Sequence, residues 1–159
     1  MLYFLFMSIV HAKCPLSTQT GEQPIEIAAT ELPELLSQTK GCTTLIEIWA
    51  SWCGPCVQLA PHMLQFHKTH PDVFILSISV DTTLGPMKAF INKHQAPGLQ
   101  VHLKTWSIES LENVFEPYGL QFPGKIPYLV LLNADGSVDH HLTEPKELNF
   151  PTLNAEKNE

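Results

Sequence analysis

The sequence predicts an α/β fold in which helices flank a central mixed sheet, and three observations support this prediction. Two apolar runs, at 44–50 and 73–80, contain a single charged residue between them, as strands covered on both faces do. Between these runs, apolar residues recur every three or four positions from Cys56 onward, which is the spacing of a helix with one buried face. A strand, a helix and a strand in this order form a right-handed parallel crossover. A chain of 159 residues is long enough for one such domain with a sizeable core.

The amino-terminal residues are predicted to precede this domain. Residues 2–10 are almost wholly apolar but too few to span a bilayer, so we expect 1–12 to be a signal peptide or a short hydrophobic segment. The alternative is a buried first strand. Residues 13–24 are rich in proline and polar residues and are predicted to be a linker. The domain itself is predicted to occupy 25–145, followed by a polar tail at 146–159.

Within the domain, hydrophobic periodicity and turn residues place the other elements. Further strands are predicted at 25–27, 99–103, 126–132 and 137–142, and helices at 30–39, 55–69, 86–94 and 108–118. The last two strands are joined by Asn133-Ala134-Asp135-Gly136, which is a good turn signal for an antiparallel hairpin. After Pro145 the periodicity weakens, so we expect no more than a short turn there.

The charge balance excludes some classes of partner. The chain carries 9 basic and 16 acidic residues, a net charge of −7, and every basic residue is a lysine. Nucleic-acid binding is not expected, because it relies on basic patches and on arginine forks that pair with phosphate. The sequence also lacks a polybasic patch of the kind that binds an anionic membrane surface.

The motif Cys53-Gly54-Pro55-Cys56 lies where an apolar run ends and a helix is predicted to begin. A thiolate at Cys53 would be stabilised there by free backbone N–H groups and by the helix dipole. Pro55 suits the first turn of that helix, and Cys56 falls on its buried stripe. We therefore expect Cys53 to be the accessible attacking sulfur and Cys56 the shielded resolving one. A zinc site would need four ligands and a second paired motif, which the sequence lacks.

Two further positions bear on this chemistry. Glu47 is the charged residue in the run at 44–50, and a buried carboxylate without a partner has a raised pKa. The alternative is a glutamate that reaches solvent at a sheet edge. Pro127 opens an apolar strand, where a trans proline would interrupt pairing, so we expect a cis bond between Ile126 and Pro127. An ordinary trans proline at the strand start is the alternative.

Residues 46–56, followed by Ala60-Pro61, resemble the active-site segment of thioredoxins, and Ile126-Pro127-Tyr128 resembles the cis-proline loop of that family. Between these segments the chain is longer than in a plain thioredoxin, with an inserted helix-strand-helix stretch before the cis-proline loop. The insertion is similar to that of the TlpA- and ResA-like thiol-disulfide oxidoreductases. The resemblance covers roughly residues 25–143 and implies a thioredoxin-like fold.

The same resemblance implies roles for individual residues. Glu47 would carry the proton to and from Cys56, and the Ile126 backbone beside Pro127 would pair with the substrate chain as an added strand. The lysine that thioredoxins carry on the neighbouring strand is replaced by Ser77 or an adjacent apolar residue, so Glu47 would lack its usual partner. Three residues of the motif would contact the substrate: Trp52, Gly54 and Pro55.

The other two cysteines are Cys14 and Cys42. Export would place the chain in an oxidising compartment, where four cysteines can form two pairs. Cys14 and Cys42 would then be a structural bridge beside the catalytic pair. The sequence leaves this pairing open, because it does not determine how far apart the two Cα atoms lie.

From these residues we expect a thiol-disulfide oxidoreductase that reduces protein disulfides outside the cytoplasm, in the periplasm or attached to the membrane through its amino-terminal segment. The expected partners are protein disulfide substrates and a membrane-embedded electron donor, and we expect a monomer without a metal or other cofactor. The Gly-Pro pair between the cysteines is that of reducing thioredoxins. The alternatives are an oxidase or isomerase with the same residues, and a copper-handling binding module with Cys53 and Cys56 as soft ligands.

Overall fold

The sheet is the centre of the fold in the computed structural model, which describes residues 14, 16 and 23–142. In this part of the chain the strands form a six-stranded sheet with the order β1-β4-β3-β2-β5-β6. Their bounds are β1 (Ile25–Ala28), β2 (Thr44–Trp49), β3 (Phe74–Ser79), β4 (Leu99–Thr105), β5 (Tyr128–Leu132) and β6 (Val138–Leu142). The first four strands in this order are parallel, whereas β5 is antiparallel to β2 and β6 to β5. The predicted mixed sheet is therefore confirmed.

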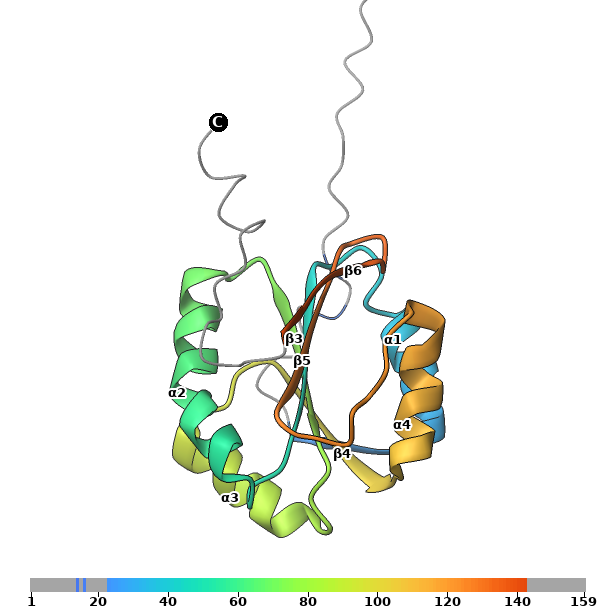
Figure 1. Ribbon diagram of the computed structural model, residues 1–159. Helices are drawn as coiled ribbons and strands as arrows, with labels where there is room; N and C mark the ends of the chain where they lie inside the picture. The colour runs from blue at the N-terminus through green and yellow to red at the C-terminus, as the bar shows by residue number, and fades with distance from the viewer. Residues whose placement is uncertain (1–13, 15, 17–22, 143–159) are drawn as a thin grey trace, which may run out of the picture.

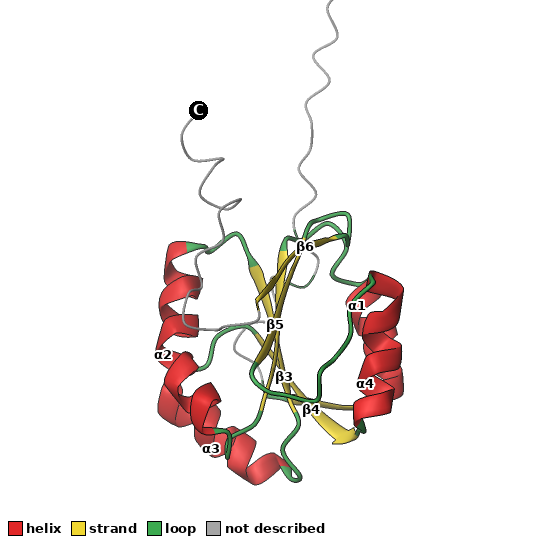
Figure 2. Cartoon of the chain, viewed as in Figure 1, coloured by secondary structure: helices red, strands yellow, loops and turns green. Residues whose placement is uncertain are grey.

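Helices cover both faces of the sheet. The helices are α1 (Leu32–Ser37), α2 (Gly54–Thr69), α3 (Leu84–His94) and α4 (Ile108–Phe115), with short 3-10 turns η1 (Ala29–Glu31) and η2 (Glu116–Tyr118). Figure 1 shows α2 and α3 on one face and α1 and α4 on the other. The same three layers are visible in Figure 2, where helices flank the strands on either side. None of the described helices is both long enough and apolar enough to cross a membrane.

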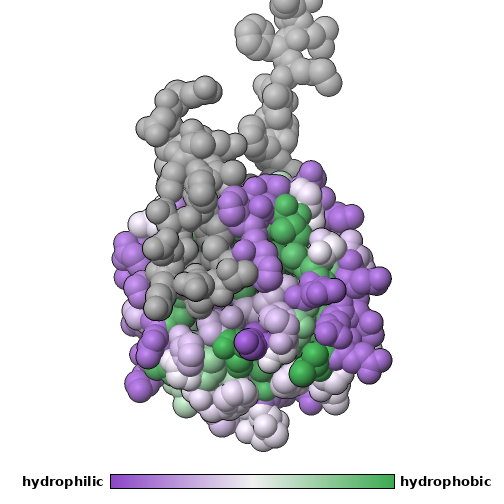
Figure 3. Space-filling view, in the orientation of Figure 1, coloured by the Kyte–Doolittle hydropathy of each residue, from purple (hydrophilic) through white to green (hydrophobic). Residues whose placement is uncertain are grey.

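The central strands are buried along their whole length. All six positions of β2 and all six of β3 are buried, as the two apolar runs of the sequence predict. Leu45 of β2 packs in one cluster with Leu59 and Met63 of α2. Successive side chains of a strand point to opposite faces, so Leu45 and Glu47 both point toward α2. The face of the molecule in Figure 3 is mostly hydrophilic, with separate hydrophobic patches.

The inserted elements are α3, β4 and α4, and β4 lies between β1 and β3 in the sheet. Val101 of β4 is paired with Ile25 of β1 and with Ile78 of β3. The chain enters β4 through Gly98, whose φ is +85° and whose missing Cβ would collide with the carbonyl oxygen of Ile75. A side chain at position 98 would therefore prevent the close approach that brings β4 onto β3.

Most predicted element boundaries are confirmed to within about two residues, and three segments differ from the prediction. The helix predicted at 108–118 ends at Phe115 and is followed by the turn η2. The region predicted as one helix at 30–39 contains the turn η1 followed by the shorter α1. The strand predicted from 126 begins at Tyr128, because Pro127 has no N–H to pair and its bond to Ile126 is cis. The predicted signal peptide, most of the predicted linker and the predicted polar tail lie outside the described residues.

Candidate active site

Cys53 and Cys56 are joined by a disulfide at the start of α2. The chain leaves β2 at Trp49 and turns, with the Cys53 N–H donating to the Ala50 carbonyl over 3.1 Å. Cys53 is the N-cap residue of α2, and its Sγ accepts from the backbone N–H of Cys56 over 3.2 Å. The N-terminal N–H groups of a helix have no partner within the helix. These donors and the helix dipole therefore act directly on the sulfur of Cys53.

Both sulfur-bearing residues are buried in the disulfide form. Cys53 is 5% exposed and Cys56 is 1% exposed. The prediction that Cys56 is shielded is confirmed. The prediction that Cys53 is accessible is wrong for the disulfide form, in which Cys53 is buried as well. Trp52 beside it is 67% exposed, and Gly54 and Pro55 of the first helical turn are exposed as well. A substrate would therefore meet this exposed rim before it reaches the sulfur of Cys53.

The loop at Pro127 lies against the disulfide. The bond between Ile126 and Pro127 is cis, as predicted. The carbonyl oxygen of Ile126 lies 3.6 Å from Cys53 Sγ, although 73 residues separate them in the sequence. This contact arises because β5 is antiparallel to β2, so the residues before β5 lie at the edge where β2 ends. In the dithiol form the Cys53 thiol has an acceptor in this carbonyl.

A cavity of about 720 Å³ adjoins Pro127 on the α4 side. It lies between the start of α4 and the loop that leads to β5. Ile108, Leu120 and Phe122 contribute apolar wall, and Glu112 and Lys125 contribute charge. A cavity of this size next to Pro127 has room for a side chain of a bound polypeptide.

Glu47 is buried in the middle of β2, with 7% of its surface exposed. Ser77 is its partner in the β2–β3 register, and the Ser77 hydroxyl donates to Glu47 Oε2 over 3.2 Å. Burial removes water from the carboxylate and raises the pKa of Glu47 from 4.5 to about 7, although the Ser77 hydrogen bond partly opposes this shift. Glu47 points toward α2, the helix that carries Cys56. The predicted buried carboxyl is confirmed, and a solvent-facing glutamate is excluded.

Asp81 is a buried residue beside the motif that the sequence analysis did not identify. It is 2% exposed, and both of its carboxylate oxygens accept from the backbone N–H of Ser51 over 3.1 Å. The signal available in the sequence was weak, because Asp81 only ends an apolar run. Thirty positions separate Asp81 from Ser51, and no local pattern pairs residues that far apart.

Cys14 and Cys42 form a second disulfide, with their Cα atoms 4.8 Å apart. The pairing that the sequence left open is thereby confirmed. Cys42 is buried and precedes β2, so this bridge lies near the amino end of the strand whose carboxyl end leads to Cys53.

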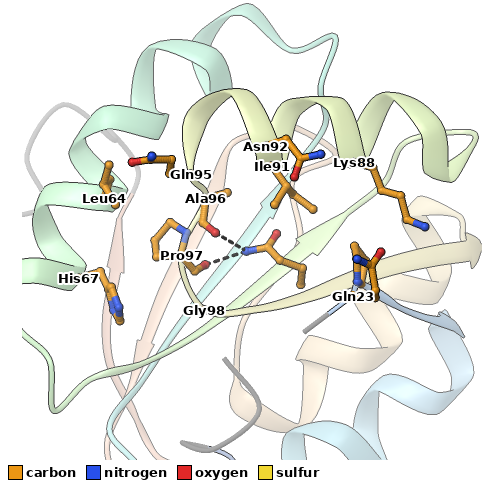
Figure 4. A pocket seen from close by; sticks show the side chains of 12 residues that line it. Gln23, Leu64, His67, Lys88, Ile91, Asn92, Gln95, Ala96, Pro97 and Gly98 are labelled. Carbon is orange, nitrogen blue, oxygen red and sulfur yellow. Dashed lines mark hydrogen bonds between the residues drawn. The ribbon is translucent and has the colours of Figure 1, made fainter. Parts of the chain in front are cut away.

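A separate cavity of about 420 Å³ lies between α2, α3 and the start of β4. Figure 4 shows His67 of α2 and Lys88 and Asn92 of α3 around it. Gln100 closes one side by donating to the carbonyls of Ala96 and Pro97. None of the predicted site residues lines this cavity, so we do not assign it to the disulfide chemistry.

Comparison with known proteins identifies relatives of two kinds. A family model described as thioredoxin-like matches residues 41–138. The chain is 30% identical over 100 residues to thioredoxin C-3 of Corynebacterium nephridii, which covers 62% of this chain and 67% of that protein. It is 26% identical over 125 residues to the thiol-disulfide oxidoreductase ResA of Bacillus thuringiensis, which covers 76% of this chain and 67% of ResA.

A solved structure shares the fold. The thioredoxin domain of a thiol-disulfide oxidoreductase from Bacteroides vulgatus aligns with a TM-score of 0.58 at 19% sequence identity. The alignment covers 75% of this chain and 81% of that domain. At this level of identity the likeness concerns the arrangement of the strands and helices.

Proposed function

The chain belongs to the thioredoxin-like family of thiol-disulfide oxidoreductases, and from that premise we propose that it reduces disulfides of protein substrates outside the cytoplasm. The observation that carries this proposal is the position of the Cys53–Cys56 disulfide at the N-terminus of α2, with the Ile126 carbonyl 3.6 Å from Cys53 Sγ. A pair of sulfurs in this position can accept and return electrons, and the backbone beside it can hold an extended polypeptide.

The reaction begins with the dithiol form. The Cys53 thiolate attacks one sulfur of the substrate disulfide, and the substrate S–S bond breaks as a mixed disulfide forms. The released substrate thiolate takes up a proton. Cys56 then loses its proton and attacks Cys53 Sγ, which closes the Cys53–Cys56 disulfide and releases the second substrate thiolate. Two electrons pass from the protein to the substrate, and the structure corresponds to the oxidised state that this turnover leaves.

Glu47 is the proposed proton acceptor for Cys56. Its pKa of about 7 makes it half-ionised near neutral pH, so it can take a proton and return it under the same conditions. Its burial on the face of β2 that packs against α2 supports this role, because Cys56 lies on α2 and is buried as well. Cys53 needs no such partner, because the N-terminus of α2 stabilises its thiolate.

The proposed substrate contacts lie around Cys53. The backbone of Ile126, next to Pro127, pairs with an extended segment of the substrate in the manner of an added strand. The exposed Trp52, with Gly54 and Pro55, supports the same segment from the other side of the sulfur. The cavity beside Pro127 receives one of its side chains.

A location outside the cytoplasm is supported by the second disulfide. The Cys14–Cys42 bridge is of the kind that persists in oxidising compartments, and residues 2–10 have the composition of a signal-peptide core. In such a compartment the oxidised pair must be reduced again after each turnover. We propose a membrane-embedded electron donor for this step.

The test is the equilibrium reduction potential of the Cys53/Cys56 pair, together with turnover of an insulin-disulfide substrate with dithiothreitol as the electron source. A potential near that of thioredoxin, about −270 mV, and catalytic turnover are the expected results. A potential near that of strong oxidants, about −120 mV, would overturn the direction of exchange and make an oxidase or isomerase the better assignment. Cys53→Ser is the control, because it removes the attacking sulfur and leaves the Cys14–Cys42 bridge in place.

A further inference from the structure

Asp81 carries a carboxylate that is buried and fully hydrogen-bonded. Besides the two contacts from the Ser51 N–H, Oδ1 accepts from the Ser51 hydroxyl and Oδ2 from the Ser79 hydroxyl, each over 2.7 Å. The backbone N–H and the two hydroxyls all donate to this carboxylate, and such donors stabilise its ionised form. The structure therefore holds a negative charge in the interior beside the turn after β2.

Ser51, the residue that donates to this carboxylate, lies close to Cys53 in the chain. Ser51 precedes Cys53 by two residues, so their Cα atoms are at most about 7.6 Å apart. The turn between them is closed by the bond from the Cys53 N–H to the Ala50 carbonyl. Asp81 accepts from both the backbone N–H and the hydroxyl of Ser51. These bonds fix the turn, and so they help to set the position of Cys53.

The main chain at Asp81 is held as well. His102 of β4 is 3% exposed, and its Nε2 lies 2.9 Å from the Asp81 carbonyl oxygen. Its Nδ1 lies 3.0 Å from Glu26 Oε2 of β1. Residue 81 is thus anchored through the inserted strand β4.

We propose that Asp81 is a positioning residue of the Cys53/Cys56 pair, which holds the turn before Cys53 and keeps beside it a negative charge that disfavours the Cys53 thiolate. The inference rests on the proposed function, because it concerns the same pair. The N-terminus of α2 acts in the opposite direction, by stabilising the thiolate. A redox pair whose reduced form is stabilised is a stronger oxidant. The Asp81 charge destabilises the Cys53 thiolate of the reduced form, so it makes this pair a stronger reductant.

The first test compares Asp81→Asn with Asp72→Asn. Both variants lose one carboxylate, but Asp72 is exposed and precedes β3, whereas Asp81 follows it. The measurement is the equilibrium of the full chain with glutathione, in which two glutathione thiols become one glutathione disulfide as Cys53–Cys56 becomes the dithiol. Asp81→Asn is expected to shift this equilibrium about tenfold toward the dithiol, or about 30 mV, and Asp72→Asn to leave it unchanged. Equal values for the two variants would overturn the proposal.

The second readout is the titration of the Cys53 thiol, followed by the ultraviolet absorbance of the thiolate. Other titratable groups face this region: Glu47 on β2, Glu26 on β1, His102 on β4 and Cys56 on α2. Because Glu47 titrates in the same pH range, the comparison is made in a Glu47→Gln background. Removing the charge is expected to lower the Cys53 pKa by on the order of one unit. A Cys53 titration at the same pH in Asp81→Asn and Asp72→Asn would count against the proposal.

Ser51→Ala keeps the proposal testable if Asp81→Asn does not fold. This variant removes one donor from the carboxylate and leaves the charge, which is then less compensated. The equilibrium with glutathione is expected to move toward the disulfide, opposite in sign to Asp81→Asn. A shift toward the dithiol, or no shift, would overturn the role of the charge. The glutathione equilibrium tests the role of Asp81 at the cysteine pair, and insulin turnover tests the proposed reductase function. Failure of one hypothesis can therefore be told from failure of the other.

Discussion

The two disulfides of this chain lie near opposite ends of the same strand and differ in their surroundings. Cys42 precedes β2 and is bonded to Cys14, 28 positions away, whereas Cys53 follows β2 and is bonded to Cys56, 3 positions away. The Cys53–Cys56 bond has a helix N-terminus and a carbonyl oxygen against one of its sulfurs. A buried carboxyl lies on the side of α2. Cys14–Cys42 lies before β2, at the other end of the strand from the helix N-terminus.

The groups around Cys53–Cys56 are of the kind that favours thiol-disulfide exchange. Donors that stabilise a thiolate make one sulfur a good nucleophile and leaving group. A bridge that closes a long segment instead restricts the unfolded chain and so stabilises the fold. The proposed roles are therefore exchange for Cys53–Cys56 and stabilisation for Cys14–Cys42, and this division can be tested from both sides.

The largest expected effect is on activity. Cys53→Ser is expected to abolish turnover of insulin disulfides, since it removes the attacking sulfur. Cys56→Ser is expected to stop the reaction at the mixed disulfide, which mass spectrometry would detect as a covalent adduct with the substrate. The double variant Cys14→Ser/Cys42→Ser is expected to retain turnover. Loss of turnover in a folded double variant would break the proposed division of roles.

The next effect is on stability. Removing the Cys14–Cys42 bridge releases a segment of 28 residues in the unfolded chain, which lowers the free energy of unfolding by about 3 to 4 kcal/mol. Urea unfolding of Cys14→Ala/Cys42→Ala, compared with the parent protein with both disulfides intact, measures this loss. A difference close to zero would mean that the bridge does not constrain the chain.

The third effect concerns Glu47 and the pH dependence of stability. Its pKa is about 7 in the folded protein and 4.5 is its ordinary value, so the folded state binds the proton more tightly. The contribution of Glu47 to the free energy of unfolding is therefore largest below pH 4.5, and it falls as the pH rises from 4.5 to about 7. Glu47→Gln is expected to remove this fall, which is on the order of 3 kcal/mol. Urea unfolding between about pH 4 and about pH 8, a range that includes both pKa values, tests whether stability falls as the pH rises.

Glu47→Gln also tests the exchange role of Cys53–Cys56, through the rate at which the mixed disulfide is resolved. If ionised Glu47 accepts the proton of Cys56, the rate at which the mixed disulfide is resolved rises as the pH passes through about 7. In Glu47→Gln this rise is expected to disappear and the rate near neutral pH to fall. Stopped-flow measurement with a peptide disulfide follows this step. An unchanged pH profile would show that Glu47 does not carry the proton.

The smallest effect is expected for Ser77→Ala. The Ser77 hydroxyl donates to Glu47 Oε2 and lowers the Glu47 pKa, so its removal is expected to move the midpoint of the resolution rate to higher pH by a fraction of a unit. Ser37→Ala, at an exposed position of α1, is the matched control. A midpoint that moves to lower pH would contradict the assigned hydrogen bond.

Much of the site could be predicted because its signals are short. The two cysteines, the proline between them and the following apolar stripe occupy consecutive turns of one helix, and local periodicity is sufficient to place them. Glu47 stands out because a charge in an otherwise apolar strand is expensive to bury. Pro127 could be assigned as cis because a trans proline would interrupt the strand that follows.

Other parts of the site depend on contacts between distant segments. The sequence predicted the inserted strand β4, but not its position between β1 and β3. The Ile126 carbonyl lies against Cys53 Sγ although 73 positions separate the two residues. Asp81 accepts hydrogen bonds from Ser51, which is 30 positions away. The expectation of an accessible Cys53 was wrong for the disulfide form, because nothing local to the motif indicates what packs against it.

By itself, then, the sequence determined the redox motif, the helix that presents it, the buried carboxyl and the order of strands and helices along the chain. These features follow from residue types and spacings within a few turns of helix or strand. Only the tertiary structure decided which strands are neighbours, that Cys14 pairs with Cys42, and that Asp81 holds the turn before Cys53. Their physical basis is packing and hydrogen bonding between segments far apart in the chain, and such contacts form only when the whole sheet is assembled.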